Sequence, residues 1–359
     1  MGNVPGVHAA AMVQYLGEDG VPVREVPLWA HEPEPLLRAY EWMMLTRMFD
    51  QKAVALQRTG QLGTFPSSVG QEAIGVACGL ALEEQDIFVP YYRDHATQLI
   101  RGAAMHDLLL YWGGDERGSH AGPAQDLPVC VPIASQCGHA VGAAAALKFR
   151  KQPQAVLCTL GDGATSKGDF LEALNLAGTW HLPVVFVINN NQWAISVPRA
   201  AQCGAPTLAQ KGWGAGIHSV QVDGNDMIAM LDVVGDALER ARHRKGPTLI
   251  EAVSYRLGDH TTADDASRYR TDDEVKAAWE REPVRRLCQF LTTQGAWNEA
   301  MDARWQDHCH TVVSKAVEQY LATPPQAAEA MFDHLYAEWP PALDEQLDLF
   351  AARMTAREV

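Results

Sequence analysis

The stretch VLCTLGDGATSKGDF, residues 156–170, decides the fold of this chain. It begins with a short apolar run typical of a buried strand and passes through two glycines into a segment with the pattern of a helix. Asp162 stands between Gly161 and Gly163, where a loop that binds phosphate directly would offer only backbone amides. Because this carboxylate would repel a bare phosphate, we expect a divalent cation between the two.

The same loop argues against a dinucleotide-binding site. The G-x-G-x-x-G fingerprint places glycine amides against a pyrophosphate, and the spacing of Gly161, Gly163 and Gly168 does not fit it. A nicotinamide-dependent enzyme of similar fold is therefore disfavoured.

Strand-like and helix-like segments alternate on both sides of the loop. Apolar runs near 155–160, 182–190, 219–224 and 248–256 are separated by helical patterns near 165–180 and 227–243. This alternation predicts an α/β fold with a central, mostly parallel sheet and helices on both faces. The strand patterns stop near residue 274, and helical patterns follow at 304–321 and 342–354. We expect an N-terminal extension at 1–30, an α/β domain at 31–273 and a helical C-terminal region at 274–359 that packs on the body or on a partner.

A second candidate metal ligand follows the next strand along the chain. The run 182–190 leads directly into Asn191, which follows Asp162 by 29 residues. That spacing fits one crossover through a helix, which brings both strand ends to the same edge of a parallel sheet. The alternative is that GDG is only a turn and that the asparagines form a polar strand exit.

Charge and cysteine content narrow the class of protein. The chain has 29 Lys and Arg residues against 44 Asp and Glu residues, a net charge of −15, which disfavours nucleic acid or an anionic membrane as a partner. We expect no membrane span and no signal peptide, because no apolar stretch is long enough and the N-terminus lacks a basic region before an apolar run. The seven cysteines are odd in number and form no CxxC pair, so we expect reduced thiols and a cytoplasmic protein.

The GDG loop followed about thirty residues later by NN resembles the thiamine diphosphate-binding motif. The resemblance implies that Asp162, Asn191 and the backbone carbonyl of Trp193 hold Mg2+ against the diphosphate of the cofactor. It also implies that Gly161, Gly163 and Ala164 contact the cofactor.

Six segments in order resemble the alpha subunit of the decarboxylating component of 2-oxo acid dehydrogenase complexes, from about residue 30 to the C-terminus. They are GTFPSSVGQEA (63–73), PYYRDH (90–95), PIASQCGHAVG (132–142), GDGATSKGDFLEALNLAG (161–178), LPVVFVINNNQWAIS (182–196) and SYRLGDHTTADDASRYR (254–270). Six ordered segments are far more specific than any one motif.

The resemblance assigns further roles. Tyr92, Arg93 and Arg256 bind the diphosphate, to which arginines suit well. The aminopyrimidine half of the cofactor is held at Val131 and Ile133. The active-site histidine is His260, where a near-neutral pKa would suit proton handling. The loop 261–270 after it is expected to be mobile until the cofactor binds, and the substrate entrance is assigned to Phe65 and Gln136.

One group that thiamine chemistry requires is missing from the motifs. A carboxylate must protonate the aminopyrimidine ring, and this chain contains only the diphosphate-binding half of the cofactor site. The resemblance implies that a beta subunit supplies this glutamate at an interface, in an assembly of two alpha and two beta chains; Glu72 is the best rival within the chain. The implied activity is decarboxylation of a 2-oxo acid, pyruvate first, with acyl transfer to a lipoyl domain of the acyltransferase. The alternatives are a branched-chain 2-oxo acid, then acetoin, then a non-catalytic scaffold subunit.

Overall fold

The computed structural model describes residues 11–119, 122–333 and 335–355. The chain divides into two compact units, of which the first ends at Val317 and the second begins at Glu318. The helices between Asp272 and Val317 belong to the first unit. The predicted domain boundary at residue 273 stays a prediction.

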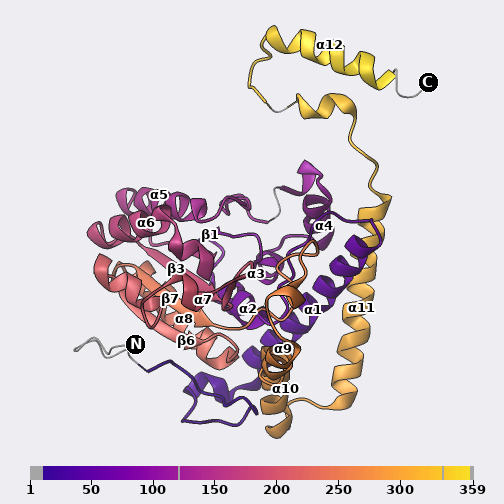
Figure 1. Cartoon of the computed structure of the whole chain (residues 1–359). Coiled ribbons are helices and arrows are strands. Elements are labelled where there is room, and N and C mark those ends of the chain that lie inside the picture. The colour runs from indigo at the N-terminus through magenta and orange to yellow at the C-terminus, as the bar shows by residue number, and fades with distance from the viewer. Residues whose placement is uncertain (1–10, 120–121, 334, 356–359) are drawn as a thin grey trace. The chain divides into compact units, whose positions relative to one another are not determined.

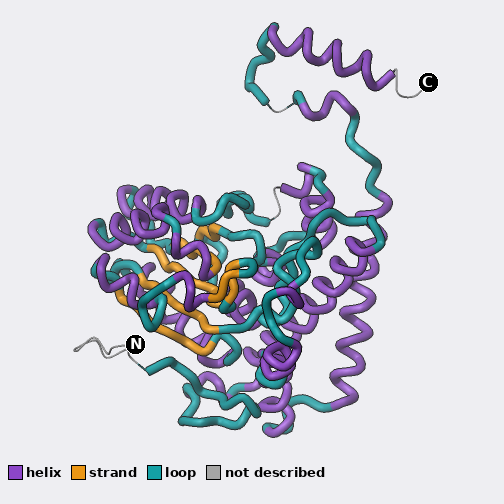
Figure 2. The backbone as a smooth tube through the Cα atoms, viewed as in Figure 1, coloured by secondary structure: helices purple, strands orange, loops and turns teal. Residues whose placement is uncertain are grey.

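The centre of the first unit is a five-stranded sheet in which every pairing is parallel, in the order β1-β2-β3-β7-β6 (Figures 1 and 2). The strands are β1 (Ile87–Val89), β2 (Val156–Gly161), β3 (Val184–Asn190), β6 (His218–Asp223) and β7 (Thr248–Val253). The expected α/β fold with a parallel sheet is confirmed. A short antiparallel pair, β4 (Trp193–Ala194) and β5 (Val197–Pro198), follows β3.

Helices cover both faces of the sheet because successive strand residues point to opposite sides. In β3, Val185 and Val187 pack in one apolar cluster with residues of α1 (Pro33–Arg58), α2 (Glu72–Ala81) and α8 (Met227–Arg242). Phe186, between those two valines, packs in the other cluster with α5 (Ser135–Phe149) and α6 (Gly168–Thr179). Figure 1 shows α5 and α6 together on one side of the strands.

The helix after the GDG loop begins later than the pattern near 165–180 predicts. Residues Asp162–Ser166 form a 3-10 turn, in which the Thr165 hydroxyl donates to the Asp162 carbonyl at 2.8 Å. Lys167 is extended, with φ −88° and ψ 146°, so α6 begins only at Gly168. The extended residue keeps the loop separate from the helix and leaves the Asp162 side chain at the strand end.

The remaining elements connect and flank this sheet. They are α3 (His95–Ile100), α4 (Met105–Gly113), α7 (Arg199–Gln202), α9 (Asp272–Trp279), α10 (Pro283–Thr293), α11 (Glu299–Ala322), and the 3-10 turns Leu28–His31, Glu116–Ser119, Ala209–Ala215 and Ala266–Arg268. Of the predicted N-terminal extension, residues 1–10 lie outside the described residues. The part that follows bonds to the sheet through a parallel bridge between Val13 and Val222.

The second unit contains a 3-10 turn (Ala328–Met331) and α12 (Ala342–Thr355). Phe332 packs its ring against Trp339 and Phe350, with centroids 6.1 and 6.2 Å apart. Within the described parts of both units, no helix combines the length and the apolar character needed to cross a bilayer.

Candidate active site

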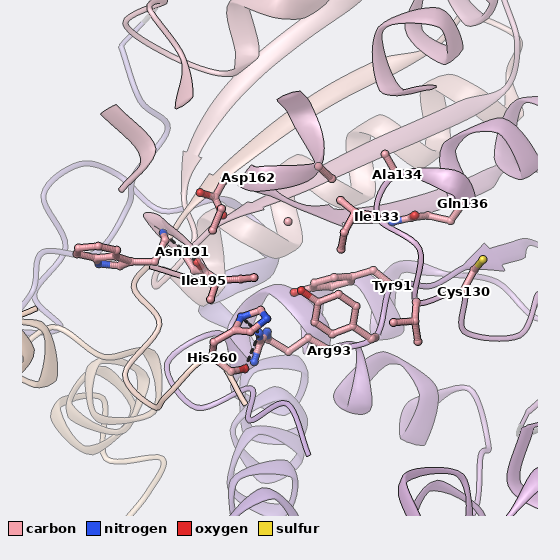
Figure 3. A pocket seen from close by; sticks show the side chains of 17 residues that line it. Tyr91, Arg93, Cys130, Ile133, Ala134, Gln136, Asp162, Asn191, Ile195 and His260 are labelled. Carbon is pink, nitrogen blue, oxygen red and sulfur yellow. Dashed lines mark hydrogen bonds between the residues drawn. The ribbon is translucent and has the colours of Figure 1, made fainter. Parts of the chain in front are cut away.

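A cavity of about 190 Å³ lies at the carboxyl ends of β2 and β3 and brings together most of the predicted site residues (Figure 3). Twelve of them line it: Tyr92, Arg93, Val131, Ile133, Gln136, Gly161, Asp162, Gly163, Ala164, Asn191, Trp193 and His260. Ligands of doubly wound α/β folds bind at this edge of the sheet. Arg256 and Phe65 are not among the lining residues.

Asp162 is a buried carboxylate at the end of β2, with only 3% of its surface exposed. Burial raises the pKa of its side chain to about 6, while hydrogen bonds from its own backbone N–H and that of Gly163 oppose the rise. Gln202 Nε2 lies 3.4 Å from one carboxylate oxygen. At neutral pH the group is ionised and available to a cation.

Asn191 and Trp193 add two neutral oxygens beside it. The Asn191 amide nitrogen donates to Gln71 Oε1 at 2.8 Å, and its Oδ1 accepts from the Trp193 N–H at 3.2 Å. The Trp193 carbonyl accepts from Arg256 at 3.2 Å. The described residues contain no cluster of three or more His, Cys, Asp and Glu side chains suited to a metal. A set of one carboxylate, one amide and one carbonyl oxygen suits a hard cation that keeps phosphate and water ligands, such as Mg2+.

Two buried arginines stand beside these oxygens without a carboxylate partner. Arg93 is 4% exposed and Arg256 is 0% exposed. Arg93 donates to the carbonyls of Ser67 and His260, and Arg256 donates to the carbonyls of Trp193 and Ile195 and to a tyrosine hydroxyl. Within the described parts of the chain, neither forms an ion pair, and the Nε of each lacks a hydrogen-bond partner. Two uncompensated buried cations favour an anionic ligand.

The two arginines also determine the state of His260. Its Nδ1 lies 3.3 Å from an Arg93 nitrogen and 3.4 Å from an Arg256 nitrogen. Because a guanidinium only donates, Nδ1 must accept, and the proton of the neutral ring is on Nε2. Burial, then Arg93 and Arg256, lower the pKa of His260 to about 4, although Asp264 raises it. The expected near-neutral pKa is therefore wrong for the chain without a bound anion.

The loop 261–270 supplies hydrogen-bond partners to His260 and to Arg256. The His260 N–H donates to Asp264 at 2.9 Å, and the Tyr269 hydroxyl accepts from Arg256 at 2.8 Å and donates to Asp264. Arg270 donates to three successive carbonyls of residues 256–258. The mobility expected of this loop before the cofactor binds stays a prediction.

The two residues assigned to the substrate entrance differ in position. The Phe65 side chain is 0% exposed and stacks on His95 with ring centroids 4.7 Å apart, and its backbone pairs with Thr262 in the loop. Gln136 lines the cavity and donates to the Thr159 carbonyl at 3.0 Å, and its Oε1 has no hydrogen-bond partner among the residues that the structure describes. Their roles at the entrance stay predictions.

Some functional neighbours were not found from the sequence. Tyr91, Cys130, Ala134, Ala194 and Ile195 also line the cavity. All of these except Cys130 lie within the six segments that carry the resemblance, so membership of those segments was the available signal. Glu72, the rival carboxylate, does not line the cavity. It is 1% exposed and forms an ion pair with Arg47 at 2.7 Å.

In this α/β fold, arginines that form no ion pair among the described residues lie beside oxygen donors at one strand edge, which makes the cavity a candidate site for an anionic cofactor. The Dehydrogenase E1 component family matches residues 40–329, and the chain belongs to this family. Membership of this family implies thiamine diphosphate as the cofactor.

Curated relatives cover nearly the whole chain. The 3-methyl-2-oxobutanoate dehydrogenase subunit alpha of Mycobacterium tuberculosis is 39% identical, covering 95% of this chain and 94% of the relative. The pyruvate dehydrogenase E1 component subunit alpha is 42% identical in Acholeplasma laidlawii, covering 88% of this chain and 92% of the relative. In Staphylococcus epidermidis it is 37% identical, covering 94% and 92%. The resemblance to the alpha subunit of a thiamine diphosphate-dependent 2-oxo acid dehydrogenase is confirmed.

Proposed function

We propose that this chain, together with a beta subunit, decarboxylates pyruvate with thiamine diphosphate and Mg2+ and transfers the acyl group to a lipoyl domain of an acyltransferase. The observation that carries the proposal is the pair of buried arginines, Arg93 and Arg256, unpaired with carboxylates and next to Asp162 and Asn191. A diphosphate with a divalent cation would match the charges of this site, because the anion would compensate the two arginines and the cation would compensate the Asp162 carboxylate.

The residues present fit this cofactor. Asp162, Asn191 Oδ1 and the Trp193 carbonyl would hold Mg2+, and the cation would have to compete with the donors that Asn191 Oδ1 and this carbonyl now accept from. Tyr92 and Arg93 would contact the diphosphate, and Arg256, behind the cavity wall, would support it electrostatically. Gly161, Gly163 and Ala164 would form the wall next to it. When bound, thiamine diphosphate supplies a carbanion nucleophile and an electron sink.

We assign His260 a donating role. Because Nδ1 accepts from the arginines, its Nε2–H is the group available to an oxygen of the substrate or acyl group. A neutral donor stabilises developing negative charge and can release its proton during acyl transfer. His260→Ala should leave decarboxylation with an artificial acceptor partly intact while impairing lipoyl acylation; equal loss of both would argue against this role.

A second subunit is needed to complete the site. Among the residues that line the described cavity, Asp162 is the one carboxylate, and its expected role is to bind the metal. Glu72 is held by Arg47, so it is not free to activate an aminopyrimidine ring. The cavity wall contains Val131 and Ile133, which are 52% and 44% exposed. Large exposed apolar side chains next to an incomplete site suit coverage by the glutamate-bearing beta subunit, in an assembly of two alpha and two beta chains.

The candidate substrates follow from the names of the relatives. The relatives named for pyruvate support pyruvate, and the mycobacterial relative supports a branched-chain 2-oxo acid as the second candidate. Acetoin cleavage and a scaffold role come after these two substrates.

All seven cysteines are free, which supports the expected cytoplasmic location.

The test is an assay of the chain co-purified with its beta subunit. Decarboxylation of pyruvate and of 3-methyl-2-oxobutanoate is measured with and without thiamine diphosphate and Mg2+. We expect cofactor-dependent turnover with a preference of at least about tenfold in kcat/KM for pyruvate, since even one methylene in an apolar pocket changes it by about 10- to 200-fold. The reverse preference would favour the branched-chain function. If a cofactor-loaded complex turned over neither 2-oxo acid, acetoin cleavage would become the next candidate function, followed by a non-catalytic scaffold role.

A further inference from the structure

Gln71 is a buried polar residue near the candidate active site that the proposed function leaves without a role. It immediately precedes α2, is 3% exposed, and its N–H donates to the Ser68 carbonyl at 2.9 Å. The turn before it requires glycine, because Gly70 has φ +90° and a Cβ there would lie 2.5 Å from the Tyr255 carbonyl. The backbone thereby brings Gln71 to the end of β3, 120 residues further along the chain.

Among the described residues, the side chain of Gln71 makes one hydrogen bond, and that bond is to Asn191. Gln71 Oε1 accepts from the Asn191 amide nitrogen at 2.8 Å, and Asn191 is itself only 4% exposed. The other terminal atom, Gln71 Nε2, is buried and has no partner within the part of the chain that the structure describes. Leaving a buried amide donor without a partner costs free energy. We therefore attribute the orientation of the Gln71 side chain to its hydrogen bond with Asn191.

Two neighbours together fix which way the Asn191 amide points. The Trp193 N–H donates to Asn191 Oδ1 at 3.2 Å on one side, and Gln71 Oε1 accepts from Nδ2 on the other. In the flipped amide, Nδ2 would meet the Trp193 N–H and Oδ1 would meet Gln71 Oε1, so two donors and two acceptors would face each other. The observed orientation puts the amide oxygen on the same side as Trp193, whose carbonyl belongs to the same expected set of metal ligands.

We propose that Gln71 is a positioning residue that holds the Asn191 side chain with its oxygen, rather than its amide hydrogens, toward the divalent cation. This inference rests on the proposed function, because it requires Asn191 to be a metal ligand. A cation is repelled by an amide NH2 group, so an Asn191 side chain free to rotate would lose part of its affinity for the metal. Partners that orient metal ligands typically change affinity by about 10- to 100-fold when they are removed.

The experiment measures Mn2+ binding by electron paramagnetic resonance to the complex of alpha and beta subunits with saturating thiamine diphosphate. Gln71→Met keeps the length of the side chain and removes the acceptor, and we expect its Kd for Mn2+ to rise by about tenfold or more. Gln71→Glu keeps an acceptor for the Asn191 amide in either protonation state, and we expect it to restore affinity close to that of the wild type. Thermal melting of each variant shows that it folds.

A double-mutant cycle separates positioning from general loosening of the site. In the Asn191→Ala background, Gln71→Met should have no further effect on Mn2+ affinity, because Gln71 acts through the amide that has been removed. Additive losses, or equal affinities of Gln71→Met and the wild type, would overturn the inference and leave the proposed function intact. A wild-type complex that binds neither Mn2+ nor thiamine diphosphate would overturn the proposed function, and this inference with it.

Discussion

Replacing Gly163 by alanine tests whether the GDG loop and the β4 segment form one site. The added Cβ would lie 2.6 Å from the Ala194 Cβ and 3.6 Å from its Cα. Ordinary contacts of this kind are at least about 3.4 Å, so one segment must move by about 0.8 Å. Ala194 directly follows Trp193, whose carbonyl is an expected metal ligand, and its short side chain cannot swing aside.

Two consequences follow in the assay. Overpacking of a well-packed position costs about 1–3 kcal/mol, so Gly163→Ala should lower the melting temperature of the assembled complex without cofactor. Because the shift would also displace the neighbouring Trp193 carbonyl, an expected metal ligand, thiamine diphosphate should bind about 10- to 100-fold more weakly by isothermal titration calorimetry in the presence of Mg2+. We expect the loss in affinity to exceed what the loss in stability explains.

The matched control for Gly163→Ala is Gly168→Ala, which changes another glycine of the same stretch. A Cβ on Gly168 would have Glu172 Oε1 as its nearest neighbour, at 3.9 Å, and Gly168 begins α6, where alanine is favourable. The control should melt at or above the wild-type temperature and bind the cofactor normally. If Gly163→Ala behaved like Gly168→Ala, the contact between the GDG loop and β4 would not constrain the site, and the reasoning would be refuted.

Three further predictions concern charge. Because burial raises the pKa of Asp162 to about 6, Mg2+ affinity should fall as pH drops through that value, and Asp162→Asn should weaken binding and abolish this dependence in calorimetry. The pKa of His260, about 4 in the chain alone, should rise when thiamine diphosphate compensates the arginines; an unchanged NMR titration would contradict the site. Arg256→Met should weaken cofactor binding by about 10- to 100-fold, because it removes the partner of the Trp193 carbonyl and a positive charge behind the cavity wall, and it should raise the pKa of His260; unaltered affinity would exclude this role for Arg256.

The sheet and the position of Asp162 and Asn191 at one cavity were predictable because they depend on local patterns. The buried strand residues 184–188 are apolar without interruption, and the rule that parallel strand ends meet at one edge places Asp162 near Asn191. The start of α6 was predicted too early. It depends on the extended backbone of Lys167 and on the hydrogen bond from Thr165, neither of which has a periodic signature.

The parts of the site that could not be predicted depend on contacts between distant segments. The pKa of His260 depends on Arg93, which is 167 residues away in the chain, and no sequence spacing encodes a distance of 3.3 Å between them. The contact of Gln71 with Asn191 is of the same kind. Phe65 lies within one of the recognised segments, but its ring stacks on His95, and its backbone forms the hydrogen bonds to the loop.

The different partners of the buried arginines explain how a chain of net charge −15 can bind an anion. Arg47 and Arg286 are paired with carboxylates at 2.7 and 2.6 Å, so their charge is already compensated within the fold. Arg93 and Arg256 instead donate to carbonyls and to a hydroxyl, which satisfy hydrogen bonds but leave each guanidinium without a carboxylate in direct contact among the described residues. That arrangement destabilises the free chain, and a diphosphate would relieve it without displacing any carboxylate. We therefore expect the same two charges that lower the pKa of His260 to form the part of the site that selects an anion.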